Sequence, residues 1–477
     1  MFSDLSPSYQ HLFSVISAAA DKLGYKAYVV GGFVRDYYLG RLNSEGLADI
    51  DIMTIGSGVK LAAQVAKDLG AGPVNEYKQF GTAHFNYDRM SVEFVGARRE
   101  SYRRESRKPI VEDGTLEDDQ QRRDFTINAL SWSLNKEDFG LLLDPFGGIQ
   151  DLHQGVLRTP IDPMITFDDD PLRMLRAIRF AGQLNFTIDE PTYAGIKACA
   201  ERIKIISQER ITDELNKMLL CEKPSLPFSM LFKTGLLKII FPELHNLQGV
   251  DEVNGHRHKD NFWHTLEVVD NISQRTNDLW LRWAALLHDI AKPPTKRFDP
   301  KEGWTFHGHD ALGARWVKSI FRRFGLPMDE RMKYVAKLVR LHLRPIALAS
   351  EIVTDSAIRR LIFDTGNDID DLMTLCRADI TSKNHEKVNR YLKNFDRVAE
   401  KIIEVEEKDR LRNWQPPVDG IEIMDTLGLK PGRAVGVIKK AIEEAILNGD
   451  IPNEHDAAFA FMMEHKDELL RDFHDNN

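Results

Sequence analysis

The chain has 477 residues, of which 42% are hydrophobic and 29% are charged, and its 64 basic against 73 acidic side chains give a net charge of −9. Because single domains usually contain ~100–200 residues, we expect three or four domains. The composition excludes collagen-like and disordered proteins, and the net negative charge disfavours a protein that coats nucleic acid along its whole surface.

The N-terminal segment is predicted to be a helix and not a signal peptide. Leu12, Phe13, Ile16 and Ala20 have helical spacing, and Asp4 stands where a signal peptide would be basic. The mean hydropathy is −0.36 and apolar runs are short, which excludes a transmembrane enzyme. Three cysteines are too few for a disulfide framework or a cysteine-rich zinc site. We therefore expect a cytoplasmic protein with no membrane partner.

Element patterns divide the chain into an α+β first part and all-α parts that follow it. Segments 25–32, 48–56 and 91–98 are rich in β-branched residues and contain glycine at or near their ends, which predicts strands. From about residue 150 helical patterns dominate, with a loop expected at 299–310 and a proline- and glycine-rich boundary at 412–420. A last helical unit includes a helix that we expect to stop at Gly449.

Gly31 and Gly32 lie between a predicted strand and a predicted helix. Glycines let backbone N–H groups approach a phosphate, and a helix N-terminus attracts negative charge. Arg35 would add a bidentate donor for the same anion. A glycine pair before a helix is by itself more often only a turn.

Asp49 and Asp51 are two residues apart on a predicted strand, so both carboxylates face one side while Ile50 and Ile52 face the core. Two adjacent acids repel each other unless cations hold them, and carboxylate oxygens suit Mg²⁺. Glu93, on another alternating strand, is the candidate third carboxylate. The alternative is a solvated acidic edge, which the nearby glycine motif makes the weaker interpretation.

Four motifs in order resemble those of class II tRNA nucleotidyltransferases, the CCA-adding enzymes, and of the related bacterial poly(A) polymerases. They are residues 31–36, Asp49 with Asp51, residues 122–130 and residues 169–180. The resemblance implies a nucleotidyltransferase head at 1–150, a helical neck that reads the nucleobase at 151–225, an HD-like helical body at 226–395 and a tRNA-binding helical tail at 396–477.

The same resemblance implies roles for individual residues. Asp49 and Asp51 would bind the catalytic Mg²⁺ ions. The triphosphate would be held by Gly31, Gly32 and Arg35, and the ribose by Arg123, Asp124 and Asn128. Asp144, Gly148 and Arg158 resemble the hinge between head and neck. Asp170 and Arg173 would read the nucleobase, and Arg176 and Arg179 of the same motif would also bind the nucleotide.

Asp170 and Arg173 are three apart on a predicted helix and hence neighbours. Cytosine and adenine both present an amine donor beside a ring-nitrogen acceptor, which a carboxylate and a guanidinium complement, whereas uracil and guanine present the opposite pattern. The pair would therefore select CTP and ATP without a template. Alternatively, Asp170 is an N-cap before Pro171 and Arg173 only its surface partner. For residues 122–130, the alternative is the start of an amphipathic helix with an exposed arginine pair.

Two basic regions are candidates for binding RNA through its phosphates. Recognition of an acceptor stem would then depend on shape and backbone, since base edges of double-stranded RNA are poorly accessible. The denser region contains Arg98, Arg99, Arg103, Arg104, Arg107 and Lys108, and the second, in the tail, contains Lys430, Arg433, Lys439 and Lys440.

His264, His288, Asp289 and Asp379 stand in the order that resembles HD-domain phosphohydrolases. Imidazole and carboxylate together suit a transition metal, which activates water near neutral pH. His309 and His342 are candidate extra ligands or phosphate contacts. The alternative is a buried histidine–aspartate pair without a ligand.

The sequence thus predicts a template-independent enzyme that adds CMP and AMP from CTP and ATP to the 3′ end of tRNA and releases pyrophosphate. Two alternatives remain open: a poly(A) polymerase or partial adder, and an HD phosphohydrolase whose head only docks RNA. The oligomeric state is not predicted.

Overall fold

The computed structural model describes residues 4–42, 48–77, 81–103, 106–250, 252–253, 256–257, 260–350, 354–381, 385–409 and 414–475. The chain folds into two compact units, Met1–Pro242 and Glu243–Asn477. The three cysteines are buried and free, as expected for a chain without disulfides. Within the described segments, every helix is either too short or too polar to cross a membrane.

A seven-stranded sheet organises the first unit, with strand order β3-β4-β5-β2-β1-β8-β9. Strand β2 pairs antiparallel with β1 and parallel with β5, so it lies in the middle of the sheet. The strands are β1 (Lys26–Val30), β2 (Ala48–Ile55), β3 (Asn75–Tyr77), β4 (Thr82–Tyr87), β5 (Met90–Gly96), β8 (Ser131–Ser133) and β9 (Leu142–Leu143). The three strands predicted from the sequence correspond to β1, β2 and β5.

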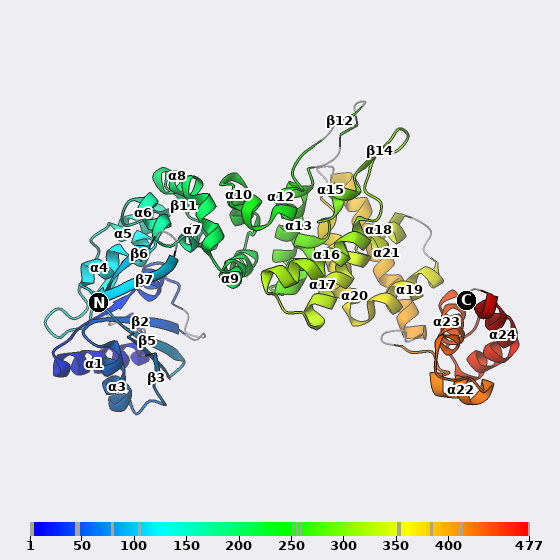
Figure 1. Ribbon diagram of the computed structural model, residues 1–477, viewed down its shortest axis with the longest axis horizontal. Coiled ribbons are helices and arrows are strands. Elements are labelled where there is room, and N and C mark those ends of the chain that lie inside the picture. The colour runs from blue at the N-terminus through cyan, green and yellow to red at the C-terminus, as the bar shows by residue number, and fades with distance from the viewer. Residues whose placement is uncertain are drawn as a thin grey trace. The chain divides into compact units, whose positions relative to one another are not determined.

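Helices α1 (Pro7–Leu23) and α3 (Gly58–Leu69) lie together on one face of this sheet (Figure 1). The predicted apolar stripe of α1 is buried there, and Gly24, in the left-handed conformation at φ 68°, ends the helix. Strand β2 contributes Ile50 and Ile52 to this core, and both are fully buried. The opposite face of the same strand is thereby left for polar side chains.

Shorter elements complete the head. A separate hairpin is formed by β6 (Arg98–Arg103) and β7 (Ser106–Asp113). The remaining elements are α2 (Gly32–Tyr38), α4 (Leu116–Gln121), the 3₁₀ turn η3 (Thr126–Asn128) and α5 (Gly148–Gln154).

Helices dominate the chain after the head, as predicted. The pairs α6·α8, α7·α9 and α7·α10 pack against each other. The elements are β10 (Val156–Leu157), α6 (Pro163–Asp169), α7 (Leu172–Leu184), β11 (Thr187–Ile188), α8 (Glu190–Cys199), η4 (Ala200–Ile205), α9 (Gln208–Leu219), α10 (Ser225–Lys233), α11 (Leu236–Ile240) and α12 (Pro242–His245).

The second unit begins with a bundle of helices whose core includes Trp283, Phe321 and Leu338. Its helices are α13 (Asn261–Ser273), α14 (Leu279–Leu287), α15 (Lys292–Thr295), α16 (His309–Phe324), α17 (Glu330–Leu341), α18 (Leu343–Ser350), α19 (Asp355–Thr365), the 3₁₀ turn η5 (Gly366–Asp368), α20 (Ile369–Asp379) and α21 (His385–Asp409). Two small hairpins accompany them, β12 (Glu252–Val253) with β13 (His256–Arg257) and β14 (Arg297–Asp299) with β15 (Gly303–Thr305). The loop expected at 299–310 is therefore partly wrong, because its first half belongs to the second hairpin.

Three helices end the described chain, α22 (Gly420–Leu427), α23 (Arg433–Asn448) and α24 (His455–Asp475). They share an apolar core of their own, in which Ile438, Ile442 and Met462 are fully buried. Gly449 ends α23 at φ 85°, as the sequence predicts.

Candidate functional site

Two carboxylates lie on the polar face of β2. Asp49 is exposed and Asp51 half-buried, whereas Ile50 between them is fully buried, so the expected alternation is present. Glu93 pairs with Asp51 across the β2–β5 ladder and therefore stands on the same face. We call these three side chains the acid face.

The acids of this face disfavour one another's ionisation. Burial, followed by the charge of Asp49, raises the pKa of Asp51, and the guanidinium of Arg123 opposes that rise. Burial, followed by the charge of Asp51, also raises the pKa of Glu93. A cation bound at the acid face would relieve this repulsion, so the donor set fits a hard divalent ion.

A pocket of about 390 Å³ opens beside the acid face, lined by residues that include Gly32, Arg35, Arg41, Asp49 and Asp51. Gly32, Phe33 and Arg35, which line this pocket, belong to α2, and the turn from β1 lies directly before them. Gly31 adopts φ 76° at this turn, and a side chain there would place its Cβ only 2.8 Å from Nη1 of Arg123. A glycine is therefore required both by the backbone conformation and by the close approach of Arg123.

Asp124 connects the head with the neck helix α7. Its Oδ1 accepts hydrogen bonds from the Phe125 backbone and from Nδ2 of Asn128, both at 2.9 Å, and its Oδ2 accepts from Nε and Nη2 of Arg176 at 2.7 Å. Asn128 in turn accepts from Nη1 of Arg35 at 2.8 Å. Burial opposes the charge of Asp124, but Arg176 and Asn128 outweigh it and hold its pKa below the usual value.

Segment 122–130 contains a short 3₁₀ turn at Thr126–Asn128 and is otherwise irregular, so the alternative of an amphipathic α-helix with an exposed arginine pair is wrong. The side chains of Arg122 and Arg123 are only 23% and 18% exposed, and both form ion pairs with the fully buried Asp119. Arg123 is thereby fixed next to Gly31. The turn also lies beside the predicted hinge, where Asp144 accepts from the Gly148 and Ile149 N–H groups and Arg158 pairs with Asp189.

Asp170 and Arg173 differ from the expected arrangement on one helix. Asp170 lies two residues before the start of α7, and its carboxylate accepts from the Leu172 N–H at 3.1 Å, but the N-cap itself is Pro171, so Asp170 contacts the helix start without occupying the N-cap position considered as an alternative. Arg173 is no surface partner, because it is 8% exposed and donates to the backbone carbonyls of Thr166 and Arg122. It does lie close enough to Asp124 to help lower its pKa.

Three guanidinium groups surround the ring of Phe180 on α7. Arg35, Arg176 and Arg179 lie 5.1, 5.3 and 3.9 Å from its centroid, within the range of cation–π attraction. Arg179 also forms a buried ion pair with Glu214 of α9 at 2.5 Å. The aromatic ring thus helps to hold cations from head and neck close together at this junction.

The structure describes most side chains of the tail basic region but few of those in the region of β6 and β7. Arg98 lies on β6 and is half-buried. Arg104 lies outside the described residues, as do the side chains of Arg99, Arg103, Arg107 and Lys108, whose backbone belongs to β6 and β7. In the tail, Lys439 donates to Gln415 and Lys440 is exposed, both on α23. Lys430 and Arg433 beside them are exposed as well.

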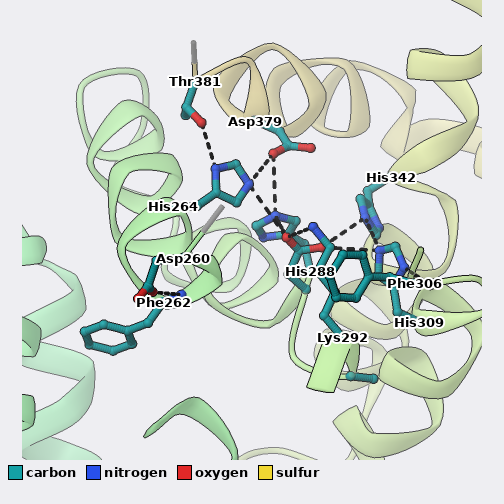
Figure 2. Close-up of polar contacts among 12 residues, drawn as sticks. Asp260, Phe262, His264, His288, Lys292, Phe306, His309, His342, Asp379 and Thr381 are labelled. Carbon is teal, nitrogen blue, oxygen red and sulfur yellow. Dashed lines mark hydrogen bonds and ion pairs between the residues drawn. The ribbon is translucent and has the colours of Figure 1, made fainter. Parts of the chain in front are cut away.

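The predicted HD residues converge within the helical bundle of the second unit (Figure 2). Nε2 of His264 lies 2.8 Å from Oδ1 of Asp379, and Nε2 of His288 lies 3.2 Å from Oδ2 of Asp289. The other ring nitrogens face Thr381 Oγ1 and the Ala285 carbonyl, both at 2.7 Å. This arrangement turns both Nε2 atoms inward, as in metal-bound histidines.

Charges within this group are strongly coupled. Burial lowers the pKa of His288, but Asp289 and Asp379 outweigh burial and raise it to about 10. Nε2 of His288 is buried, and within the described residues no partner meets it with hydrogen-bond geometry although Asp289 is near. Such an atom fits a metal ion better than the alternative of a satisfied histidine–aspartate pair.

Ligand atoms of His264, His288 and Asp379 lie within 4.8 Å of one another, and so do those of Asp289, His309 and His342. In the part of the chain that the structure describes, no set of three such atoms converges in this way at the acid face. Mg²⁺ is usually held by one or two carboxylates together with water and substrate phosphates, so two adjacent acids remain a sufficient protein contribution.

Comparison with known proteins identifies the head. Residues 27–158 match the poly A polymerase head domain, residues 185–248 the probable RNA and SrmB-binding site of polymerase A, and residues 261–384 the HD domain. An A-adding tRNA nucleotidyltransferase of Deinococcus radiodurans is 34% identical over 72% of this chain and 78% of its own length. The chain belongs to the tRNA nucleotidyltransferase and poly(A) polymerase family. It is therefore an enzyme of the nucleotidyltransferase class, and its head and HD domains imply the use of divalent metal ions.

Other members of the family differ in the names they carry. The multifunctional CCA protein of Nitrosospira multiformis is 34% identical over 70% of this chain and 79% of its own length. The CCA-adding enzyme of Bacillus stearothermophilus, solved in complex with CTP, shares the fold with a TM-score of 0.68 at 22% identity, covering 98% of this chain and all of that one. That of Thermotoga maritima, solved with tRNA, gives a TM-score of 0.61 at 22% identity over 99% and 97% of the two chains.

Several residues of this nucleotidyltransferase site were missed by the sequence reasoning. Asp119, which holds Arg123, stands four residues before it on α4, a spacing that indicates a helical ion pair. Glu214 lies 35 residues from Arg179, and no local pattern links the two. Arg41, which lines the head pocket, was likewise not singled out. In the HD group, Lys292 was missed as well, although it pairs with Asp289 at 2.5 Å.

Proposed function

We propose that this nucleotidyltransferase adds CMP and AMP from CTP and ATP to the 3′ end of tRNA without a nucleic-acid template, releasing pyrophosphate. The observation that carries the proposal is the acid face beside the pocket of Gly32, Arg35 and Arg41. This one cavity is lined both by carboxylates that suit a cation and by guanidinium groups that suit phosphates. That combination suits the transfer of a nucleotidyl group from a triphosphate.

Asp49 and Asp51 would hold Mg²⁺, with Glu93 as the neighbouring acid. Mg²⁺ at this position supplies charge stabilisation for in-line attack on the α-phosphate. Side chains of the protein would bind and orient the nucleotide. Arg35, held by Asn128, would bind the triphosphate, while Asp124 and Asn128 at the turn η3 would orient the ribose.

The nucleobase would be selected at the start of α7. Arg173 lies close to the buried carboxylate of Asp124, and Asp170 stands just before the same helix, so a base bound there would continue from a ribose held at η3. For Arg173 to read a base, its guanidinium must exchange a backbone carbonyl for the base edge. We expect Arg173→Ala to blur the choice between CTP or ATP and UTP or GTP, whereas unchanged selectivity would remove the base-reading role.

Addition of AMP alone is the second candidate, and a specific observation favours it. The relatives from Deinococcus radiodurans and Aquifex aeolicus, 34% and 36% identical to this chain, are both A-adding enzymes, although the latter alignment spans only 32% of that protein. Residues of the acid face and of η3 would serve either reaction equally. Nucleotide usage therefore has to be measured.

tRNA would be the acceptor, and its backbone would be bound by the basic region of β6 and β7 and by Lys439 and Lys440 of α23. Relatives of this fold have been solved with tRNA, with ATP and with CTP. Exposed lysines in the tail can neutralise phosphates without reading base sequence. Replacing Lys440 by Gln should weaken tRNA binding at low salt and leave nucleotide choice unchanged.

The deciding experiment supplies CTP and ATP, separately and together, to tRNA that ends at the discriminator base, at –C and at –CC. Ordered addition of two C and one A supports the CCA reaction, whereas A addition restricted to the –CC substrate supports the A-adding candidate. Asp51→Asn should abolish incorporation and retain tRNA binding, with the exposed Asp68→Asn as the matched control. Full activity of Asp51→Asn would refute the assignment of the acid face, and a long A tail would indicate a poly(A) polymerase.

We further propose that the HD group of the second unit hydrolyses phosphate esters. The inward-facing Nε2 atoms of His264 and His288 beside Asp379 carry this proposal. His288→Asn should abolish metal-dependent hydrolysis of p-nitrophenyl phosphate or its bis ester and leave nucleotide incorporation intact. Hydrolysis that survives this change would exclude the HD group as its site.

A further inference from the structure

The polar face of the head sheet continues past the acid face onto β4. His84 of β4 pairs with Glu93 across the antiparallel β4–β5 ladder, and Ser91 pairs with Asp49 across the parallel β2–β5 ladder. Residues paired directly across a ladder point to the same side of a sheet. His84 therefore stands beside Glu93, and Ser91 beside Asp49, on the side that carries the acid face.

The imidazole of His84 is held in place by Ser91. Nε2 of His84 lies 3.0 Å from Oγ of Ser91, and both side chains are half-buried. Ala83 and Phe85, the neighbours of His84 on β4, are fully buried on the opposite face, so the strand cannot turn the imidazole away from the acid face. In the part of the chain that the structure describes, Nδ1 of His84 has no hydrogen-bond partner. The His84–Ser91 pair, as we call these two side chains, can therefore accept a further hydrogen-bonding group.

The pocket assigned to the triphosphate occupies only one side of the acid face. Its lining comes from α1, from α2 and the residues after it, and from the first half of β2, whereas no residue of β4 or β5, both of which are fully described, contributes to it. In the sheet, β1 and β5 lie on opposite sides of β2. A pyrophosphate bound by Gly32 and Arg35 would thus lie on the β1 side of Asp51, and the β5 side is left for another substrate.

The geometry of in-line transfer places the acceptor on that free side. The attacking 3′-oxygen of the acceptor and the pyrophosphate oxygen that leaves stand on opposite sides of the α-phosphorus. With the pyrophosphate on the β1 side, the 3′-hydroxyl approaches over β5, next to Glu93. The exposed Glu93 leaves this approach open.

The sugar that carries the 3′-hydroxyl has a second hydroxyl on the adjacent carbon. Neighbouring strands are about 4.8 Å apart, so a 3′-hydroxyl at Glu93 brings the 2′-hydroxyl within hydrogen-bond reach of His84 on the next strand. A hydroxyl both donates and accepts, and it can join the His84–Ser91 pair whichever ring nitrogen carries the proton. Contacts to the 2′-hydroxyl are the means by which a protein distinguishes RNA from DNA.

We propose that the His84–Ser91 pair binds the 2′-hydroxyl of the last nucleotide of the acceptor, so that His84 makes transfer specific for an acceptor that ends in a ribonucleotide. This inference rests on the proposed transfer at the acid face. It concerns the sugar of the acceptor, whereas Asp124 and Asn128 are assigned to the sugar of the incoming nucleotide. The alternative is that the pair only braces β4 against β5, in which case its loss would affect every acceptor equally.

The test uses two tRNA acceptors that end at –CC and differ only at the last 2′ position. One carries the 2′-hydroxyl and the other a 2′-fluorine, which keeps the RNA-like shape of the sugar but cannot donate a hydrogen bond. With ATP as the second substrate, we expect the parent chain to prefer the hydroxyl-ended acceptor by about 3- to 10-fold in kcat/KM, as one hydrogen bond contributes.

His84→Phe should slow transfer to the hydroxyl-ended acceptor more than transfer to the fluorine-ended one, and so remove the preference, with the KM for ATP unchanged. His84→Gln, which keeps a donor and an acceptor, should retain part of the preference. The matched control is His11→Phe, at an exposed position on α1, which should keep all of it.

An unchanged preference in His84→Phe, with both acceptors slowed equally, would overturn the proposal and assign the pair to bracing the strands. A parent chain that uses both acceptors equally would overturn it as well, and would leave the proposed function intact. No incorporation by the parent into either acceptor would refute the proposed function and this inference together. If circular dichroism shows that His84→Phe does not fold, Ser91→Ala removes only the hydroxyl that holds the ring; it should reduce the preference, and an unchanged preference in that variant would overturn the proposal.

Discussion

Replacing Asp124 by Asn tests whether the link between head and neck is electrostatic. Asn keeps the shape of the side chain but has no charge, and an amide can offer only one acceptor where Asp124 accepts from Asn128, from the Phe125 backbone and twice from Arg176. Arg176 then loses its carboxylate partner. Breaking a buried ion pair from one side costs about 3–5 kcal/mol. Because the Arg176 side chain is 34% exposed and water recovers part of this loss, we expect about 2–3 kcal/mol.

Hydrogen–deuterium exchange of peptides that span η3 and α7 measures this loss locally. A change of 2–3 kcal/mol corresponds to roughly 30- to 150-fold faster exchange where local opening limits it. A double-mutant cycle with Arg176→Met isolates the pair, and Asp124→Asn should cost much less in that background. Equal costs in both backgrounds would refute the link. Asp68→Asn, on the surface of α3, should leave exchange unchanged.

The pH dependence of the same variant gives an independent check. The folded-state pKa of Asp124 is lowered, so its charge stabilises the fold above the unfolded-state value of about 3.9 and this contribution disappears as the pH falls through the folded value. The difference in stability between the parent and Asp124→Asn should therefore be largest near neutral pH and shrink in acid. A constant difference would contradict the ionic origin.

Three further changes probe other parts of the head. Gly31→Ala places a Cβ 2.8 Å from Nη1 of Arg123 at a residue with φ 76°, which strains the turn by about 1–2 kcal/mol. This change should raise the KM for the nucleoside triphosphate, whereas filter assays should show unchanged tRNA binding. Glu214→Gln leaves the buried guanidinium of Arg179 without its carboxylate partner. Chemical denaturation should show the first unit destabilised by about 3–5 kcal/mol. A loss below about 1 kcal/mol would show that water replaces Glu214. The pKa values of Asp51 and Glu93 are raised, so the rate of nucleotide transfer should fall on acidification at a pH above the usual carboxyl range. Added Mg²⁺ should move this fall in rate to lower pH. A pH profile that does not respond to Mg²⁺ would contradict metal binding at the acid face.

The sequence predicts local features of this fold well because they depend on neighbouring residues. The alternation of Asp49, Ile50 and Asp51 reproduces the two faces of β2, and Gly449 ends α23 as expected. The nucleotidyltransferase family follows from motifs of the same local kind. The boundaries of the four predicted domains stay a prediction, since the described chain divides into two compact units near residue 242.

Contacts between distant segments could not be predicted in this way. Arg173 binds the carbonyl of Arg122, and Glu214 binds Arg179, through packing that no spacing in the sequence encodes. Asp170 was expected within a helix, yet the proline after it moves the start of α7 to Leu172. For His309 and His342 the sequence supplied the residue types, but only the fold shows that their Nε2 atoms meet.

The two proposed metal centres differ in how completely the protein supplies the ligands, and this difference affects stability. At the acid face the ligands are few and one is exposed, so substrate phosphates must complete the coordination and the fold does not depend on the ion. In the HD bundle His264 and His288 are buried, Asp379 is partly exposed, and the three ligand atoms converge before any ion binds. An ion that binds only this folded state stabilises it, by about 2.7 kcal/mol at a free concentration 100 times its Kd. Removal of metal should therefore loosen α13 and α20, which carry His264 and Asp379, while the sheet of the head keeps its protection from exchange.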